Sequence, residues 1–232
     1  VAGFVAGDII SDAVMFAPST MTVSQVQTFL NSAASTCTKG TDGTACLKDY
    51  RTTSRTMTYP YCSTYAAATN ETAAQVISKA STACGINPRV LITMLQKEQG
   101  LVTATGSALT AAKYEKAMGL QCPDSSACDP AHAGFAPQVY GAASRLVQYG
   151  EQPQSFTYRA GQTVRIPYST VASCGGANVT IANRATAALY NYTPYQPNAA
   201  ALANLYGTGD SCSTYGNRNF WRLFRDWFGS TH

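Results

Sequence analysis

The chain has 232 residues, a net charge of +4 and only 12% charged residues, so it can form one large domain or two small ones with a sizeable core. No apolar run reaches the roughly 20 residues of a membrane span, and the basic residues do not cluster with aromatic ones as nucleic-acid binding requires. Abundant Gly, Ser, Thr, Asn and Tyr indicate a secreted protein. We expect the chain to be the mature form of the protein, from which the signal peptide has been removed. Its mild positive charge suits binding to a polyanionic surface such as a bacterial wall.

The eight cysteines are an even number, with no C-x-x-C pair and only two histidines, which excludes a zinc site of the finger type. They therefore predict four disulfides formed in an oxidising compartment. Close spacing favours two local bridges, and the other two would then join longer segments, one of the many connectivities that eight cysteines allow. The expected pairs are Cys37–Cys46, Cys122–Cys128, Cys62–Cys84 and Cys174–Cys212.

The N-terminal part of the chain, to about residue 65, is predicted to be an extension. Residues 1–20 are expected to form an extended lead-in and residues 35–65 a loop-rich segment without periodicity. Between them a helix is predicted from Thr22, which suits an N-cap. A second helix is predicted to open at Asn70-Glu71 and to end at Gly85.

The clearest helix prediction covers residues 88–99. Asn87 is a favourable N-cap, Pro88 suits the first helical position, and Gly100 suits a left-handed C-cap. Glu98 falls on the apolar stripe of this helix, which otherwise consists of Leu91, Met94 and Leu95. The pattern therefore predicts a carboxylate in the core-facing last turn.

Such a carboxylate suits acid catalysis. Burial and the negative end of the helix dipole would both raise the pKa of Glu98. A carboxylic acid that stays protonated near neutral pH is what the cleavage of a glycosidic bond requires. The alternative is that Glu98 lies at the edge of the stripe, where it reaches water or pairs with an arginine.

The second half of the chain combines a loop with short elements. The loop, 117–124, is entered through glycine and closed by the expected Cys122–Cys128 bridge. Residues 155–168 alternate around Ala160-Gly161-Gln162 and predict a β-hairpin. The other expected elements are helices at 135–149, 183–192, 198–205 and 219–228 and a strand at 178–181. No repeat or linker divides the chain, so we predict one mainly α domain of the α+β class, stapled by disulfides and carrying a small β-hairpin.

Other chemistries have little support. His132 lies in a loop and His232 at the end, no G-x-S-x-G motif is present, and no glycine-rich loop carries a Walker lysine. No spacing supports a metal site built from Asp124 and Asp129, so neither a metal nor a cofactor is expected. Glu98 in an apolar setting and Asp124 in a wetter loop would instead form the carboxylate pair of a glycoside hydrolase, although Asp124 suits an Asx-turn as well.

Three segments carry a resemblance to a known family. The helix that ends in Lys97-Glu98-Gln99-Gly100 resembles the catalytic "D-P-x-L-L-x-x-I-x-x-E-S" helix of the lysozyme-like superfamily, which includes goose-type lysozymes and family 23 lytic transglycosylases. Met118-Gly119-Leu120-Gln121 stands where these proteins have "G-L-M-Q", and Ala187–Tyr195 where they have "A-x-Y-N-A-G". The segments K-E-Q-G-L, C-P-D and Y-T-P-Y-Q-P-N are similar to those of secreted actinobacterial wall-active muramidase-like proteins. Gln99 departs from the family's serine, the second segment is contracted, and the last lacks its glycine.

The resemblance implies a lysozyme-like fold and a muramidase that cleaves the β-1,4 bond between N-acetylmuramic acid and N-acetylglucosamine. Glu98 would be the general acid. Asp124 would be the second carboxylate, because in goose-type enzymes an aspartate follows the glycine of the second segment by five residues. The residues expected to bind the glycan are Gln99, Gln121, Asp129, Tyr190, Tyr192 and Tyr195.

Several alternatives remain at this stage. Glu98 could act alone and close a 1,6-anhydro ring, as lytic transglycosylases do, or the chain could be a non-catalytic glycan-binding wall module. The second carboxylate could be Asp124, Asp129 or Asp12, and the mechanism inverting or retaining. In each case the expected partner is a peptidoglycan strand, bound by a monomer.

Overall fold

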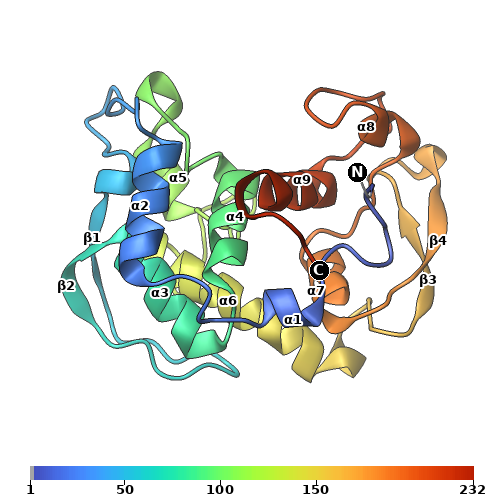
Figure 1. Ribbon diagram of the computed structural model, residues 1–232, viewed down its shortest axis with the longest axis horizontal. Coiled ribbons are helices and arrows are strands. Elements are labelled where there is room, and N and C mark those ends of the chain that lie inside the picture. Colours follow the sequence, from blue (N-terminus) through green and yellow to red (C-terminus); the bar gives the residue numbers. More distant parts are fainter. Residues whose placement is uncertain (1–2) are drawn as a thin grey trace. The chain divides into compact units, whose positions relative to one another are not determined.

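In the computed structural model, which describes residues 3–232, the chain forms two compact units (Figure 1). The central unit comprises Ala17–Arg145, and the terminal unit comprises residues 3–16 together with Leu146–His232. Residues 17–65 of the expected N-terminal extension thus belong to the same unit as the helix that carries Glu98. The assignment of the whole chain to one catalytic domain with an extension stays a prediction.

The described residues form helices and two small sheets, which confirms the predicted α+β class. The helices that begin in the central unit are α2 (Val23–Ala33), α3 (Ala73–Cys84), α4 (Pro88–Gln99), α5 (Ala111–Glu115) and α6 (Phe135–Glu151). Those of the terminal unit are α1 (Asp12–Met15), α7 (Arg184–Tyr192), α8 (Ala199–Ala203) and α9 (Gly216–Phe228). The antiparallel strand pairs are β1 (Arg51–Ser54) with β2 (Ala68–Thr72) and β3 (Thr163–Pro167) with β4 (Gly176–Thr180). No helix in the described part of the chain is long and apolar enough to cross a membrane.

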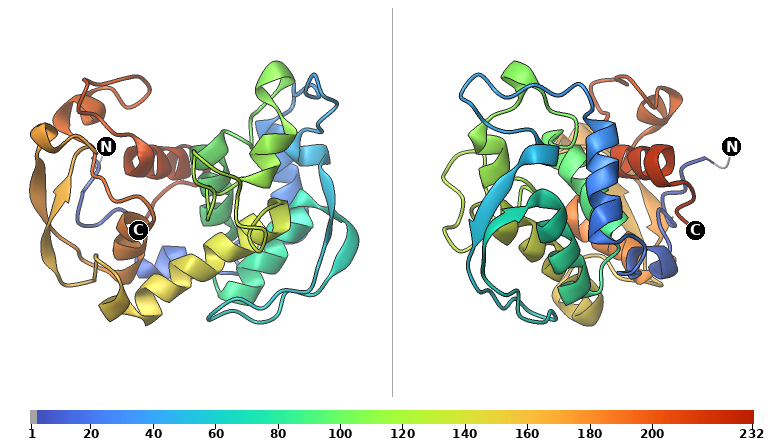
Figure 2. Two further views of the ribbon diagram at one scale, coloured as in Figure 1. Left: turned by 180° about the vertical axis from the view of Figure 1, so that it is seen from behind. Right: turned by 60° about the vertical axis from the view of Figure 1, so that its left-hand side comes forward.

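The core of the central unit lies among α2, α3 and α4. These helices pack in that order, α2 against α3 and α3 against α4 (Figure 1). The β1–β2 pair runs beside α3 in both views of Figure 2. The fully buried aliphatic side chains of these helices include Val26, Leu30, Val76, Ile77, Val90, Leu91 and Ile92. The apolar stripes that the sequence predicts therefore face one another.

The helix predicted to open at Asn70-Glu71 begins at Ala73 instead. Thr72 is its N-cap and forms a reciprocal capping box with Gln75, which satisfies two of the amides that a helix start leaves free. Glu71 belongs to strand β2 and is 4% exposed. Its carboxylate is held there by side chains of three other segments, Ser54, Tyr65 and Lys79. A buried charge needs such partners, so Glu71 stays in the strand.

Helix α4 begins and ends as the sequence predicts. The Asn87 side chain accepts a hydrogen bond from the Arg89 amide at 2.9 Å, and Pro88 occupies the first position. Gly100 has φ +60°, the left-handed conformation in which its amide bonds back to the last turn. The helix is therefore fixed at both ends, and so is the direction in which Glu98 leaves it.

The predicted β-hairpin at 155–168 is wrong, although one of its strands is present. Residues 163–167 pair with 176–180 across a longer loop, with Val164 opposite Val179. The segment before the turn does not need a strand partner because Asn191 satisfies it. The Asn191 side chain accepts from the Tyr158 amide at 3.0 Å and donates to the Tyr158 carbonyl at 2.8 Å.

The lead-in is not fully extended. Ser11 caps the four-residue helix α1, and Ile9 and Ile10 are completely buried, so this segment belongs to the core of the terminal unit. Its backbone joins the C-terminal end of the chain, because the Ser11 amide donates to the Thr231 carbonyl at 2.9 Å. The prediction failed because a stretch this short gives little periodicity.

Four disulfides lie within the two units, and they are the pairs expected from the sequence. The central unit contains three bridges and the terminal unit one. They are Cys37–Cys46, Cys62–Cys84, Cys122–Cys128 and Cys174–Cys212. Each closes a loop within one unit, so each restricts the unfolded chain without joining the units.

Candidate functional site

Glu98 lies in the last turn of α4, where its side chain is 21% exposed. The neighbouring Lys97 is more deeply buried, at 6%, and its ammonium group donates to Glu98 Oε1 at 2.7 Å. The alternative drawn from the sequence, a carboxylate paired with a cation, is thus realised with a lysine in place of an arginine. One oxygen of the Glu98 carboxylate is therefore already occupied by an ammonium donor.

The loop that follows α5 approaches Glu98 at Gly119. A Cβ placed on this glycine would lie 3.4 Å from Glu98 Oε2, at the limit of ordinary contact. The residue has φ +65°, which side chains adopt only with strain. Gly119 therefore brings the backbone against the carboxylate.

Gln138, which was not among the site residues expected from the sequence, holds this loop in place. It is completely buried in α6, and its Oε1 accepts from the amides of Met118 at 3.0 Å and Leu120 at 3.1 Å. Its Nε2 donates to the carbonyls of Leu120 at 2.7 Å and His132 at 2.8 Å. One amide side chain thus uses both acceptor sites and both donors on the backbone around Gly119.

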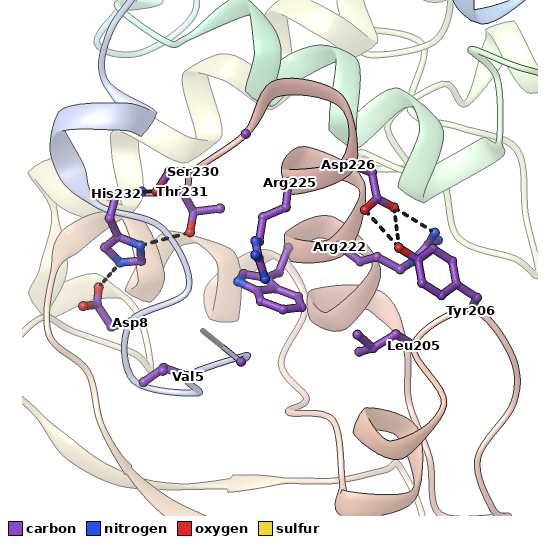
Figure 3. A pocket seen from close by; sticks show the side chains of 13 residues that line it. Val5, Asp8, Leu205, Tyr206, Arg222, Arg225, Asp226, Ser230, Thr231 and His232 are labelled. Carbon is purple, nitrogen blue, oxygen red and sulfur yellow. Dashed lines mark hydrogen bonds and ion pairs between the residues drawn. The ribbon is translucent and has the colours of Figure 1, made fainter. Parts of the chain in front are cut away.

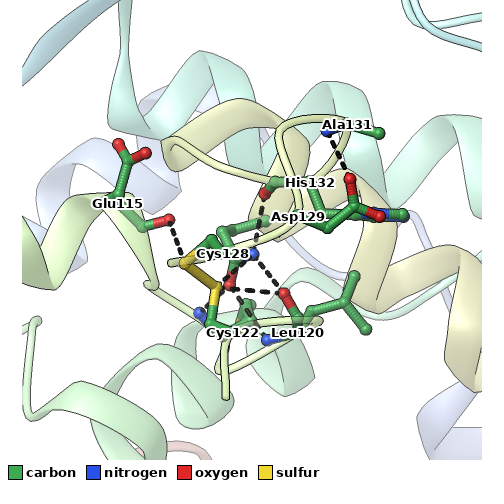
Figure 4. The surroundings of a disulfide bond; sticks show 9 residues. Glu115, Leu120, Cys122, Cys128, Asp129, Ala131 and His132 are labelled. Atoms are coloured by element: carbon green, nitrogen blue, oxygen red, sulfur yellow. Dashed lines mark hydrogen bonds and ion pairs between the residues drawn. A yellow bond between two sulfur atoms is a disulfide. The ribbon is translucent and has the colours of Figure 1, made fainter. Parts of the chain in front are cut away.

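The rest of the loop is closed by the Cys122–Cys128 bridge (Figure 4). Gln121 precedes the bridge, is exposed, and has φ +53°, an uncommon conformation for a residue with a side chain. Its carbonyl accepts from the Asp129 amide at 2.9 Å, which fixes it across the loop. Strained backbone of this kind is often found where a ligand binds.

The two loop aspartates have different surroundings. Asp124 is exposed and forms no hydrogen bond or ion pair within the described part of the chain. Asp129 closes a turn, since its carboxylate accepts from the Ala131 amide at 2.9 Å and lies 3.3 Å from His132 Nδ1. The backbone hydrogen bond from Ala131 holds the pKa of Asp129 below its ordinary value. Asp124 is thus available for a ligand, whereas Asp129 shapes the loop.

Gln99 stands at the exit of α4, where it is half-buried. Its carbonyl accepts from the Lys113 ammonium at 2.7 Å, which ties the helix end to α5. A further contact comes from Gln96. Its side chain donates to the Thr103 hydroxyl at 2.8 Å and accepts from the Thr103 backbone amide at 3.1 Å. The backbone around Glu98 is therefore braced on both sides.

The predicted tyrosines and Asp12 belong to the terminal unit. Tyr190 is completely buried, and its hydroxyl donates to the Ala6 carbonyl at 2.8 Å. Burial raises the pKa of this phenol. The structure therefore places Tyr190 in the core, where its ring offers no face to a glycan, while Tyr192 and Tyr195 are half-buried.

Asp12 serves the fold of the terminal unit. Its carboxylate accepts from the Ala185 amide at 2.8 Å, at the start of α7, and lies 3.5 Å from Arg184 Nε. Negative charge at a helix start stabilises the helix. No group of three or more His, Cys, Asp or Glu side chains within residues 3–232 is arranged to hold a metal ion.

The chain belongs to the family described as "LasA, N-terminal domain", whose model matches residues 9–231. The match extends over both units and all four disulfides. No curated protein and no solved structure matches the chain.

Proposed function

We propose that this member of the LasA N-terminal domain family has a lysozyme-like fold and acts as a muramidase on peptidoglycan. In this proposal the protein is a secreted monomer, working outside the cell where its four disulfides are stable. Glu98 is the general acid for the β-1,4 bond between N-acetylmuramic acid and N-acetylglucosamine.

The observation that supports this most is the placement of Glu98 against a rigid loop. The carboxylate leaves the end of a capped, buried helix and meets the backbone of Gly119. Gln138 and the Cys122–Cys128 bridge fix that backbone. A catalytic carboxylate needs such a supporting shell, because small displacements cost large factors in rate.

In the proposed reaction the proton of Glu98 goes to the glycosidic oxygen as the bond to the anomeric carbon breaks. In the hydrolytic version, Asp124 takes a proton from a water molecule whose oxygen bonds to the anomeric carbon. In the lytic version, Glu98 takes the proton of the sugar's 6-hydroxyl, whose oxygen closes a 1,6-anhydro ring. Gln99 and Gln121 supply amides for the hydroxyl and acetamido groups of the glycan.

The test is the rate at which purified peptidoglycan is cleared by the wild type and by Glu98→Gln. Glu115→Gln is the matched control, because it is the same substitution at an exposed carboxylate in the same unit. We expect Glu98→Gln to lower the rate by at least about a hundredfold, the lower end of a general acid's contribution, and Glu115→Gln to leave it unchanged. Equal clearance by all three proteins would refute the muramidase.

Mass spectrometry of the released fragments then separates the two versions of the reaction. Reducing ends indicate hydrolysis and 1,6-anhydro ends indicate the lytic reaction. If Asp124 activates water, Asp124→Asn lowers the rate of hydrolysis more than Asp129→Asn does. The reverse order would exclude Asp124 from this role.

A second candidate, a glycan-binding wall module without catalysis, is favoured by the ion pair between Lys97 and Glu98. With Oε1 occupied by the lysine, the carboxylate can still accept hydrogen bonds from sugar hydroxyls. This candidate predicts that the wild type sediments with insoluble peptidoglycan and releases no fragments. Release of soluble muropeptides that depends on Glu98 would rule it out.

A further inference from the structure

One cavity lies entirely within the terminal unit and holds none of the residues proposed for catalysis. Its volume is about 760 Å³. The N-terminal stretch, the segment after α8 and the polar face of α9 line it (Figure 3). A cavity of this size accommodates a ligand of one or two sugar rings or a short peptide.

One wall of the cavity is an arginine lying on a tryptophan. Trp221 is 5% exposed, and its ring meets that of Phe4 nearly at right angles, with the ring centroids 5.9 Å apart. The guanidinium of Arg225 lies over the Trp221 ring, 4.6 Å from its centroid. The stacking fixes the orientation of a planar donor group that lines the cavity.

Tyr206 stands at the rim and is 73% exposed, more than any other large hydrophobic side chain among residues 3–232. It is nevertheless held in place. Its hydroxyl donates to Asp226, 3.0 and 3.2 Å from the two carboxylate oxygens, and Arg222 lies over its ring, 4.8 Å from the centroid. An exposed aromatic ring that is fixed in advance loses little entropy when a ligand packs against it.

The charges of the cavity favour an anion. Both aspartates of the cavity already have partners in the protein. Asp226 accepts from Tyr206 and lies 3.6 Å from Arg222 Nη1, and Asp8 lies 3.0 Å from His232 Nε2. Arg222 adds a second guanidinium, whose buried Nε has no hydrogen-bond acceptor within the described part of the chain. An incoming carboxylate would meet the guanidinium of Arg225, whose planar donors match its geometry.

We propose that this cavity binds an acidic sugar, a pyranose that carries a carboxylate. The apolar face of the ring packs against Tyr206, and the carboxylate pairs with Arg225. The site is separate from the proposed catalytic residues, so it binds this ligand whether or not Glu98 is catalytic.

The experiment uses the full chain labelled with ¹⁵N and follows the indole signals of its two tryptophans. Trp221 lines the cavity, and Trp227 lies outside the lining and is the internal control. The probes are N-acetylmuramic acid, N-acetylglucosamine, which lacks the carboxylate, and N-acetyl-alanyl-alanine, which has a carboxylate but no sugar ring. We expect a saturable shift of the Trp221 signal with N-acetylmuramic acid and binding at least about tenfold weaker with each of the other two, about 1.4 kcal/mol per lost contact.

Variants assign the shift to this cavity. We expect Arg225→Gln and Tyr206→Ala each to weaken the binding of N-acetylmuramic acid about tenfold, whereas Arg159→Gln, which lies outside the lining, leaves it unchanged. Tyr206→Leu serves if the alanine variant does not fold. Glu98→Gln should bind like the wild type, so failure of the muramidase proposal leaves this one intact. No saturable shift, equal binding of the three probes, or unaltered binding by Arg225→Gln would overturn it.

Discussion

Gln138→Leu is the substitution that tests how the candidate site is held together. Leucine fills a similar volume but offers no hydrogen bond, so four backbone groups around Gly119 lose the partners that now lie 2.7–3.1 Å away. A buried polar group without a partner costs about 1–3 kcal/mol. Because a loop can turn some of these groups toward water, we expect a net loss of about 2–4 kcal/mol in the free energy of unfolding.

The measurement combines urea denaturation with amide hydrogen exchange. For a chain of this size the expected loss lowers the melting temperature by roughly 5–15 °C. The sharper signal is local. The amides of Met118 and Leu120, which donate to Gln138 in the wild type, should exchange quickly in the variant. Peptidoglycan clearance should fall as well, because Glu98 loses its rigid neighbour.

Gln148→Leu is the matched control, the same substitution on the same helix at a half-buried position. Its side chain bonds to Gln152 at 3.0 Å, well away from the loop backbone in sequence. We expect its effect on stability to stay within about 0.5 kcal/mol. If Met118 and Leu120 remain protected in Gln138→Leu, Gln138 does not hold the loop and the reasoning fails.

Three further predictions concern single features of the two units. Gly119→Ala and Gly43→Ala should each lose about 1 kcal/mol of stability, because both glycines have positive φ. Only Gly119→Ala should lower the rate of peptidoglycan clearance, because a Cβ at Gly43 meets nothing within 4 Å. Equal clearance by the two variants would refute the contact between Gly119 and Glu98. Arg218→Met should lower the free energy of unfolding, measured by urea denaturation, by about 2–4 kcal/mol, because this arginine is 4% exposed and donates to three carbonyl groups at 3.0–3.1 Å. Arg159→Met should lower it little, and equal losses in the two variants would contradict this role of Arg218. Burial raises the pKa of Tyr65, Tyr114 and Tyr190, so the unfolded chain ionises first, and the stability that is complete below about pH 10 falls above it. Absorbance at 295 nm should show these phenols titrating only together with the loss of helical circular dichroism, and full titration in a folded chain would refute the assignment.

Local patterns could predict most of the helices and the two short cysteine bridges, whereas the two longer bridges were one choice among several connectivities. Capping residues and apolar stripes depend on neighbours three or four positions away, so Asn87, Pro88 and Gly100 specify α4 without reference to the rest of the fold. Features that depend on distant partners were missed. Strand β3 pairs with β4 and not with the segment before the turn, whose backbone at Tyr158 is bonded to the Asn191 side chain. Tyr158 and Asn191 are 33 residues apart in the sequence.

The candidate site, too, was predicted only where its features depend on neighbours in the sequence. Glu98 was identified because a polar residue occupies a position on an apolar stripe. Gln138 satisfies that criterion too, since it lies three residues after Phe135 and four before Ala142. It could have been found by applying the rule to amides as well as to carboxylates. The role of Gln138 could not have been predicted in this way, because the backbone groups that it binds belong to residues 118–132.

The partner of Glu98 lies beyond this rule. Adjacent residues on a helix point about 100° apart, so Lys97 and Glu98 are not expected to face each other. They meet because Glu98 occupies the last turn, just before the chain turns away at Gly100, and because Lys97 is buried beside it. This ion pair occupies Oε1 of the carboxylate with an ammonium donor, while Oε2 faces Gly119. Proton transfer at Oε1 therefore requires the bound glycan to displace the Lys97 ammonium, whereas simple binding does not. Lys97→Met accordingly distinguishes the two proposed functions: it should raise the clearance rate of a muramidase, and it should leave a binding module without activity.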